Sequence, residues 1–252
     1  MRHHDTELYE YLQQFLTAER LQRIDEVLSF RTRHITVVLE DVFQPHNISA
    51  VLRSSDAFGV QDVHVIENYN EFETRRKIAA GTDRWLTIHR YQDEVDPRKR
   101  CVEHLRARGY RLVGTSPHGR TMSISELPID EPVALVFGGE KEGVSDELLA
   151  ACDERVFLPM YGFVESFNIS VAAAIALNDL TTRLRQSGID WGLTSDERDV
   201  LRRDWVRASV RHLEAIERRF YEDRQNQARR PPSDSPSGSR RRASDSRSAG
   251  KN

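Results

Sequence analysis

One stretch indicates the class of fold: VALVFGGEKEGVS, residues 133–145. Its first five residues are all apolar, as in a strand that is buried on both faces. Two glycines and an acid follow, and a third glycine leads into a helix predicted to begin at Ser145. Glycines at the carboxyl end of a strand allow a ligand to approach the backbone, and open α/β sheets bind ligands at that edge. The stretch therefore favours a ligand-binding α/β domain, with a purely structural turn as the alternative.

Apolar runs and helical patterns alternate on both sides of this stretch. Strands are predicted at Ile35–Leu39, Val63–Ile66, Arg111–Gly114, Val133–Phe137 and Val156–Leu158. Helical patterns lie between them, near Ile48–Phe58, Arg98–Arg108, Ser145–Ala150 and Asn168–Arg185. This alternation indicates an α/β domain with a mostly parallel sheet flanked by helices. The glycine spacing at residues 138–143 is GGxxxG rather than GxGxxG, so a nucleotide-dependent oxidoreductase is a weaker alternative.

Amphipathic helices are predicted at both ends of the α/β region. Between Glu7 and Leu28, apolar residues recur at helical spacing, which predicts one or two helices. A further helix is predicted from about Asp196 to Glu222, with Thr194 and Ser195 among its candidate caps. Seven arginines crowd the part of this helix away from its apolar stripe. They form either a solvated face paired with nearby acids or a face that contacts RNA, and the pattern leaves both open.

Charge is distributed unevenly along the 252 residues. The segment from Gln225 to Asn252 holds seven cations and two carboxylates, a net charge of +5, and because the whole chain carries −3 the rest carries −8. This segment is rich in Pro, Ser and Arg and poor in apolar residues, so it is predicted to be disordered. A body of such negative charge requires that arginines gather on one face if it is to bind RNA.

The composition is that of a globular protein with a polar surface, with 38% hydrophobic and 31% charged residues. No apolar run resembles a signal peptide or a membrane span. Cys101 and Cys152 form neither a CxxC pair nor a metal-ligand spacing. We therefore expect a reduced, cytoplasmic protein that needs no metal.

A second segment, PHNISAVLRSSDAFG at residues 45–59, follows the first predicted strand. Asn47 is expected to cap a helix that begins at Ile48, and Gly59 is expected to end it in a left-handed conformation. Arg53 stands inside this otherwise small and apolar helix. Its side chain either extends to solvent or an acid, or serves a functional site.

A third segment, VFLPMYGFVESFNISVAAAIAL, spans residues 156–177. The predicted strand ends at Pro159, a loop with Gly162 follows, and Ser166 or Asn168 is expected to cap the next helix. That helix is apolar on nearly every side. It is therefore expected to be deeply buried or to lie in an interface between subunits.

In this order the three segments resemble the signature motifs of RNA ribose 2′-O-methyltransferases of the SPOUT superfamily, and of its TrmH group in particular. The similarity covers about Arg31 to Arg185, and AAGTDRW at residues 79–85 is a further TrmH-like piece. The predicted terminal helices also resemble that group, which uses such extensions to grip tRNA. The resemblance implies a parallel sheet whose C-terminal part is threaded into a trefoil knot, a rare arrangement. It also implies a homodimer with two active sites near the interface.

The resemblance assigns roles to individual residues. It implies that S-adenosylmethionine contacts Thr115, Gly138, Gly139, Glu140, Leu158, Met160 and Phe167. Arg53 matches the family's catalytic arginine, and the other polar site positions match Asn47, Glu140, Ser166 and Asn168. The chain departs from the family pattern in having Phe167 where leucine is usual and Glu165 where glutamine is common, and Gly139 stands at a variable position. None of these departures removes a catalytic group.

The implied reaction is an in-line attack of a ribose 2′-oxygen on the sulfonium methyl group. It requires no metal, so the protein has to position the reactants and manage the hydroxyl proton. The family account gives that proton to Arg53. Because a guanidinium stays protonated in proteins, we interpret Arg53 as the group that binds the substrate phosphate and organises the 2′-hydroxyl, with proton relay as a further role.

The implied substrate is tRNA, at a guanosine of the D-loop, position 18. The same methylation of ribosomal RNA is the main alternative, and a binding protein without catalysis is disfavoured by the intact polar site residues. We expect four parts along the chain. These are an N-terminal helical extension at residues 1–30, a SPOUT methyltransferase domain at 31–187, a C-terminal helical extension at 188–224 and a disordered basic tail at 225–252.

Overall fold

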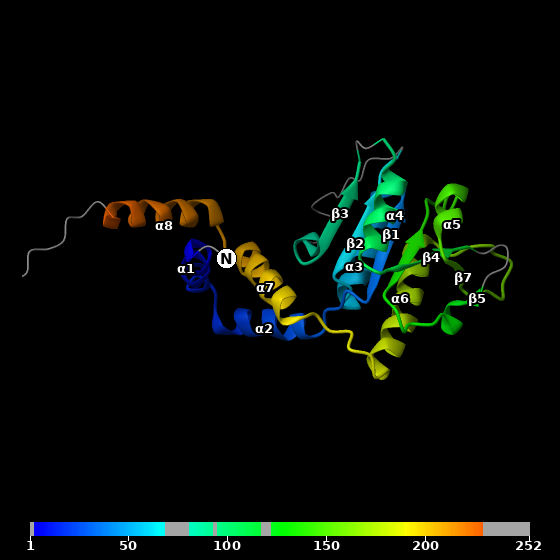
Figure 1. Ribbon diagram of the computed structural model, residues 1–252, viewed down its shortest axis with the longest axis horizontal. Helices are drawn as coiled ribbons and strands as arrows, with labels where there is room; N and C mark the ends of the chain where they lie inside the picture. The colour runs from blue at the N-terminus through cyan, green and yellow to red at the C-terminus, as the bar shows by residue number, and fades with distance from the viewer. Residues whose placement is uncertain (1–2, 69–80, 93–94, 117–121, 229–252) are drawn as a thin grey trace, which may run out of the picture.

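A seven-stranded parallel sheet forms the centre of the α/β region (Figure 1). The computed structural model describes residues 3–68, 81–92, 95–116 and 122–228. The strands are β1 (Ile35–Glu40), β2 (Asp62–Ile66), β3 (Thr87–Tyr91), β4 (Arg111–Thr115), β5 (Met122–Ser123), β6 (Val133–Phe137) and β7 (Glu154–Phe157). They lie in the order β3-β2-β1-β6-β4-β7-β5, and every pair is parallel. The predicted α/β fold is confirmed, and the trefoil knot stays a prediction.

Helices cover both faces of this sheet. They are α3 (Pro45–Ala57), α4 (Pro97–Ala107), α5 (Asp146–Ala151) and α6 (Ile169–Gln186). Ile35, Val37 and Leu39 of β1 share one core with α3 and α6, whereas Val38 faces a second core with α4 and α5. Because successive side chains of a strand point to opposite faces, the all-apolar strand β6 contributes to both cores.

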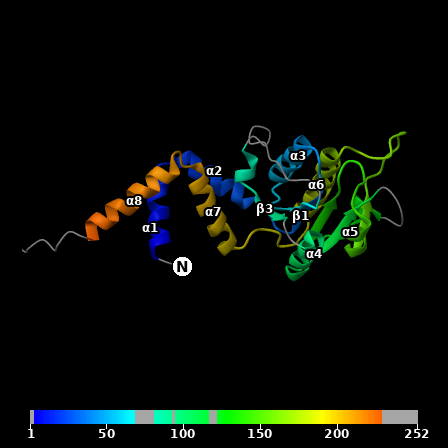
Figure 2. The same ribbon diagram turned by 90° about the horizontal axis from the view of Figure 1, so that it is seen from above.

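The terminal helices pack together as a helical extension beside the sheet (Figures 1 and 2). They are α1 (His3–Gln13), α2 (Ala18–Ser29), α7 (Ser195–Ser209) and α8 (Leu213–Ala228). Their shared core includes Leu12, Ile24 and Trp205. Trp85 follows the short helix η1 (Thr82–Arg84) and packs edge-on against Trp205, with ring centroids 5.7 Å apart. Ala79 and Ala80, which belong to the predicted motif at 79–85, lie outside the described residues.

Arg31 joins this extension to the sheet domain. Its side chain is only 1% exposed, and its guanidinium forms an ion pair with Asp56 of α3. It also donates a hydrogen bond of 3.0 Å to the backbone carbonyl of Val60. Its guanidinium carbon lies 5.1 Å from the ring centre of Trp205 in α7. One buried arginine therefore contacts both parts of the molecule at their junction.

Two helices replace the single helix that the sequence predicts from Asp196 to Glu222. α7 ends at Ser209, and His212 adopts a left-handed φ of 55° before α8 begins. The apolar periodicity continues across this break, so the pattern alone does not reveal it. α8 runs to Ala228, so the first residues of the predicted disordered tail are helical, and the rest of the tail lies outside the described residues.

Other elements differ in detail from the predictions. The N-terminal pattern forms two helices, and β3 and β5 have no predicted counterpart. β3 alternates polar residues at the sheet edge, and β5 has two residues, so neither shows the apolar run of a buried strand. β7 begins at Glu154 and leaves Leu158 in the following loop. Within the described ranges, no helix is long and apolar enough to cross a membrane.

Candidate active site

The sheet order places the carboxyl ends of β1, β6, β4 and β7 side by side. The three segments singled out in the sequence begin at three of these ends. The glycine loop follows β6, the segment with Asn47 and Arg53 follows β1, and the loop with Ser166 follows β7. Parallel sheets of this class bind ligands at their carboxyl edge. The topology therefore gathers segments that lie far apart along the chain at one edge of the domain.

The glycine loop after β6 is a tight turn in which two positions have no space for a side chain. A Cβ atom on Gly138 would lie 1.9 Å from the backbone of Gly143, and one on Gly139 would lie 2.8 Å from the carbonyl oxygen of Asp41. Gly143 itself has a left-handed φ of +71°, and its N–H donates to the carbonyl of Gly139 at 2.9 Å. The chain's own backbone therefore fills the space beside Gly138 and Gly139, so both positions require glycine, and the approach of a ligand to this loop stays a prediction.

Glu140 links this loop to the start of α3. Its carboxylate accepts hydrogen bonds from the backbone N–H groups of Phe43 and Gln44, both at 3.2 Å, and from the side-chain amide of Asn47 at 2.6 Å. The prediction that Asn47 caps this helix is wrong. The helix begins at Pro45, and Asn47 lies buried inside its first turn, where its side chain bonds to residues of other segments.

Asn168 extends the same network to α6. Its amide nitrogen donates to Oδ1 of Asn47 at 3.1 Å, and its own Oδ1 accepts from the backbone N–H of Ser170 at 2.9 Å. Of the two predicted caps, Ser166 and Asn168, it is Asn168 that forms the N-cap of α6. We name the linked side chains of Glu140, Asn47 and Asn168 the carboxamide network. It connects the glycine loop, α3 and α6 through hydrogen bonds.

The carboxamide network keeps Glu140 ionised at neutral pH. Burial by itself would raise the pKa of Glu140, but the hydrogen bonds from Asn47 and from backbone N–H groups outweigh it and hold the pKa below its ordinary value. Two of the three side chains are neutral amides. The carboxylate therefore leaves a net negative charge at the edge where the three segments meet.

Arg53 and Ser166 lie outside this network. Arg53 is exposed on α3 and has no ion pair or hydrogen bond with any described residue. Ser166 is exposed in the loop between β7 and α6, and likewise makes no hydrogen bond to the described part of the chain. Gly59 ends the helical segment that carries Arg53 with a φ of +79°, as predicted.

The remaining predicted cofactor residues lie at the ends of β4 and β7. The hydroxyl of Thr115 donates to the carbonyl of Val136 at 2.8 Å and so ties the end of β4 to β6. Leu158 is half-buried against the core under the sheet, and Met160, two residues later, is also half-buried. Phe167 is 36% exposed. The structure thus brings Thr115 and Leu158 to the same edge as the glycine loop.

A second polar cluster braces the glycine loop from behind, and no sequence pattern indicated it. Glu40, the last residue of β1, is buried and accepts hydrogen bonds from the backbone N–H and the hydroxyl of Ser145 at 2.8 and 2.6 Å. Arg98 of α4 pairs with the same carboxylate. The one available signal was an acid at the end of a largely apolar strand, because buried acids are rare unless they are paired.

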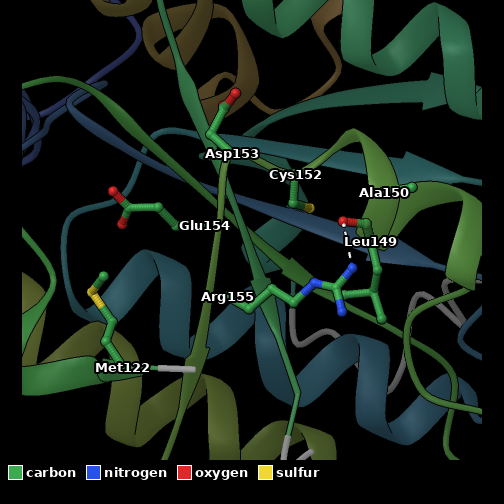
Figure 3. Close-up of a pocket in the computed structure, with 7 residues that line it drawn as sticks. All are labelled: Met122, Leu149, Ala150, Cys152, Asp153, Glu154 and Arg155. Carbon is green, nitrogen blue, oxygen red and sulfur yellow. Dashed lines mark hydrogen bonds between the residues drawn. The ribbon is translucent and has the colours of Figure 1, made fainter. Parts of the chain in front are cut away.

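A hollow elsewhere on the domain is separate from this site. It lies beside β5, β7 and the end of α5, and Figure 3 shows the side chain of Arg155 reaching the carbonyl of Leu149 across one side of it. Its lining includes Cys152, whose pKa burial raises to about 12, so the thiol stays protonated at neutral pH. None of the predicted site residues is in this lining.

Comparison with known sequences places this geometry in a group of RNA-modifying enzymes. The sequence profile of the SpoU rRNA Methylase family matches residues 34–178. A tRNA (guanosine(18)-2′-O)-methyltransferase of Borreliella burgdorferi is 39% identical over 206 residues, covering 82% of this chain and 93% of that protein. The protein of the same name from Escherichia coli is 32% identical over 170 residues, covering 68% and 72%.

Solved structures show the same fold. The TrmH/SpoU tRNA modifying enzyme of Aquifex aeolicus superposes with a TM-score of 0.68 at 28% identity, over 77% of this chain and 98% of that chain. The SpoU methyltransferase AviRb of Streptomyces viridochromogenes, in complex with the cofactor AdoMet, superposes with a TM-score of 0.52 at 27% identity, over 65% and 62%.

Proposed function

The chain belongs to the SpoU rRNA Methylase family, in its TrmH-type branch, and from this premise we propose that it transfers the methyl group of S-adenosylmethionine to the ribose 2′-hydroxyl of guanosine 18 in the D-loop of tRNA. The carboxamide network is the observation that carries this proposal. It joins all three signature segments at the carboxyl edge of the sheet, where such folds bind ligands. The relatives that cover most of this chain are named for the same reaction.

The residues at this edge fit S-adenosylmethionine. The glycine loop presents backbone groups without side chains, because a Cβ at Gly138 or Gly139 would collide with neighbouring backbone. Leu158 offers a half-buried apolar contact and Thr115 a fixed hydroxyl on the adjoining strands. We assign these residues, with Met160 and Phe167, to cofactor binding. When bound, the cofactor supplies a methyl group on a positively charged sulfur that a ribose oxygen can attack.

The protein's part in catalysis is then to position the substrate and manage one proton. Glu140 and Asn47 fix the start of α3, the helix that carries Arg53. An exposed guanidinium without a described partner is suited to a phosphate, which it can bind through two parallel hydrogen bonds. We assign Arg53 to the substrate phosphate and to organising the 2′-hydroxyl. Ser166 and Asn168 orient the loop that borders the substrate.

A homodimer is the second part of the proposal. The face of α6 away from its own core exposes Val171 (45%) and Ile175 (40%), one helical turn apart. The loop before α6 exposes Phe163 and Val164 and projects from the domain (Figure 2). Water-exposed apolar residues grouped in this way are typical of an interface. We propose a second copy of the chain as their partner, which would also bring a further loop toward Arg53.

The dimer is tested by placing a charge on this face. Ala173 is fully buried within the chain's own core, so a substitution there would report on folding rather than on assembly. Ile175→Glu is the better variant, because its side chain is exposed in the single chain. We expect a folded monomer in light scattering with little methyl transfer. A wild-type protein that is monomeric and fully active at micromolar concentration would contradict the dimer requirement.

We assign methyl transfer and RNA binding to different parts of the chain. We assign residues 31–187 to methyl transfer and the helices on either side to holding the RNA. Trp85 and Arg31 connect these parts through Trp205, so RNA held by the extension is fixed relative to the sheet edge. We place the reaction in the cytoplasm, which agrees with two cysteines that are both free thiols.

Methyl transfer to defined RNAs tests the proposed function. The full chain is incubated with labelled S-adenosylmethionine and a tRNA transcript, and we expect a single methyl group on the 2′-oxygen of residue 18. A matched tRNA with deoxyguanosine at that position should accept none, because it lacks the attacking oxygen. Ribosomal RNA fragments are incubated in the same way to test the alternative substrate. Labelling of those fragments and not of tRNA would overturn the tRNA assignment in favour of ribosomal RNA.

A further inference from the structure

A groove in the helical extension combines cations with an exposed aromatic ring. Its lining comes from the turn between α1 and α2, the turn between α7 and α8 with its flanking residues, and the segment that holds Trp85. Its lining includes Phe15, Arg20, Arg84, Arg211 and His212. No carboxylate occurs among the described residues that line it. In a chain with a net charge of −3, such a lining favours an anionic occupant.

The cations of the groove differ in how they are used. Arg20 is part of its wall, because its guanidinium lies 4.9 Å from the ring centre of Trp85 and donates to the hydroxyl of Ser209 at 3.2 Å. Arg84 and Arg211 are exposed, and neither forms an ion pair or hydrogen bond with another described residue. Two unpaired guanidinium groups at the rim of a groove are suited to phosphate oxygens.

Phe15 adds a surface of a different kind. Its ring is 46% exposed, and it is fixed from behind by an edge-to-face contact with Tyr11 at 5.2 Å. One face of Trp85 is covered by Arg20, which leaves Phe15 as the more accessible ring. Nucleobases that are not paired stack on exposed aromatic side chains of this kind, whereas bases inside a duplex are covered by their neighbours.

We propose that this groove binds one unpaired nucleotide of the substrate RNA, with its base against Phe15 and its phosphate between Arg84 and Arg211. This proposal rests on the proposed function for the identity of the RNA. The break between α7 and α8 creates the site, since it places Arg211 in a turn rather than on a continuous helix. The groove thereby selects RNA with a nucleotide outside a duplex, at a distance from the site of methyl transfer.

Equilibrium binding of the full chain to RNA tests this directly. Two ligands are compared, a tRNA transcript and a duplex RNA of equal length. Phe15→Ala should weaken tRNA binding about tenfold and leave duplex binding unchanged, because it removes a stacking surface. Arg84→Ala and Arg211→Ala should each weaken tRNA binding and lower the magnitude of its log–log salt slope by roughly 0.7 to 0.9.

Matched controls lie just outside the groove on α8. Tyr221 is an aromatic residue with 47% exposure, and Arg218 is an exposed arginine, and neither lines the groove. Because α8 is among the helices assigned to holding the RNA, these two variants measure what an exposed ring and an exposed arginine contribute outside the groove. Phe15→Ala should weaken tRNA binding more than Tyr221→Ala, and Arg84→Ala and Arg211→Ala more than Arg218→Ala. Thermal melting of all variants shows whether each is folded. Equal losses for Phe15→Ala and Tyr221→Ala, or a loss of duplex binding with Phe15→Ala, would overturn the proposal.

Different experimental results would refute the groove proposal and the proposed methyl transfer. A wild-type chain that binds tRNA through the groove but transfers no methyl group refutes the proposed function alone. A wild-type chain that methylates tRNA while Phe15→Ala, Arg84→Ala and Arg211→Ala retain its affinity and its KM refutes the groove alone. Binding affinity and methyl transfer are therefore measured on the same tRNA.

Discussion

Arg53 carries its charge on the exposed face of α3, and no described residue neutralises it. The polar groups closest to the sheet edge are instead bonded to one another in the carboxamide network. At the scale of single residues, the site thus separates groups that hold the structure from a group that is available to a ligand. This separation makes the role of Arg53 testable without loss of the fold.

Arg53→Ala should reduce methyl transfer to tRNA by at least about a hundredfold, because positioning and proton management by a side chain typically contribute that much. Its melting temperature and S-adenosylmethionine affinity should stay near those of the wild type, since its side chain is exposed. Arg53→Lys keeps the charge but loses the planar pair of donors, so it should recover only part of the rate. Single-turnover assays with labelled cofactor compare the methyl-transfer rates of wild type, Arg53→Ala and Arg53→Lys. Alanine turnover within a few-fold of wild type would contradict the assignment.

His64 makes the stability of the sheet depend on pH. It is fully buried in β2, its ring stacks on His89 at 4.5 Å, and Nδ1 is 2.8 Å from the hydroxyl of Tyr91. Burial, with the neighbouring His89, lowers its pKa from 6.5 to about 3. The unfolded chain binds a proton below pH 6.5 while the folded chain does not, so stability falls as the pH falls through this window.

We expect the free energy of unfolding to drop by about 2 kcal/mol from this group between pH 7.5 and pH 5, since one pKa unit corresponds to about 1.4 kcal/mol. Chemical denaturation across this range measures it. His64→Asn removes the titrating ring and should flatten the pH dependence by that amount. His104, whose pKa burial also lowers, contributes to what is left in the variant. Parallel pH curves for wild type and variant would contradict the prediction.

Three loops at the sheet edge act together because each is held by another element. Glu140 of the glycine loop accepts hydrogen bonds from the backbone just before α3 and from Asn47 in its first turn, and α6 is linked to α3 through Asn168. Glu40 of β1 holds Ser145 at the far end of the glycine loop. At the scale of elements, a change in the path of the glycine loop is therefore transmitted to both helices that border the site.

Gly138→Ala tests this coupling. The added Cβ would lie 1.9 Å from the backbone of Gly143, so the loop has to move, and both cofactor affinity and methyl transfer should fall more than tenfold. Gly162→Ala is the matched control, since nothing lies within 4 Å of a Cβ there and its φ is unstrained. Isothermal titration with S-adenosylmethionine compares the two variants. Wild-type affinity in Gly138→Ala would show that the loop tolerates displacement.

The two halves of the molecule are joined by a small number of buried contacts. The extension has a core of its own, and Arg31 connects that core to α3 through Trp205 and Asp56. Arg33 adds a second link, with Asp62 on β2 and Glu197 on α7, both at 2.7 Å. At the scale of the whole molecule, these contacts fix the extension relative to the sheet domain, and in the proposed complex they set the position of the RNA relative to the methyl-transfer site.

Arg31→Met should lower the free energy of unfolding by roughly 2–4 kcal/mol, because it removes a buried cation and leaves Asp56 without its partner. Asp56 is 32% exposed, so water limits the loss. The extension should then melt before the sheet domain in calorimetry. Arg23→Met breaks an exposed pair with Glu26 and should cost less than about 1 kcal/mol. A single transition at the wild-type temperature would show that Arg31 does not couple the halves.

The amino-acid sequence by itself determined the strands and helices whose pattern is local. The apolar run Val133–Phe137 is buried on both faces as predicted, and the three motif segments lie at the carboxyl edge of a parallel sheet. Asn168 caps its helix and Gly59 ends its own, because capping depends on a few adjacent residues.

Only the tertiary structure decided what depends on partners far along the chain. Asn47 is not a cap, because the helix begins two residues before it, and its side-chain amide instead donates to Glu140 and accepts from Asn168. The break at His212 is invisible to periodicity, since both helices continue the same apolar stripe against other helices. The pairing of Arg31 with Asp56 and Trp205 likewise requires contacts between residues of separate elements. Local patterns specify the elements, and long-range packing selects which polar groups meet.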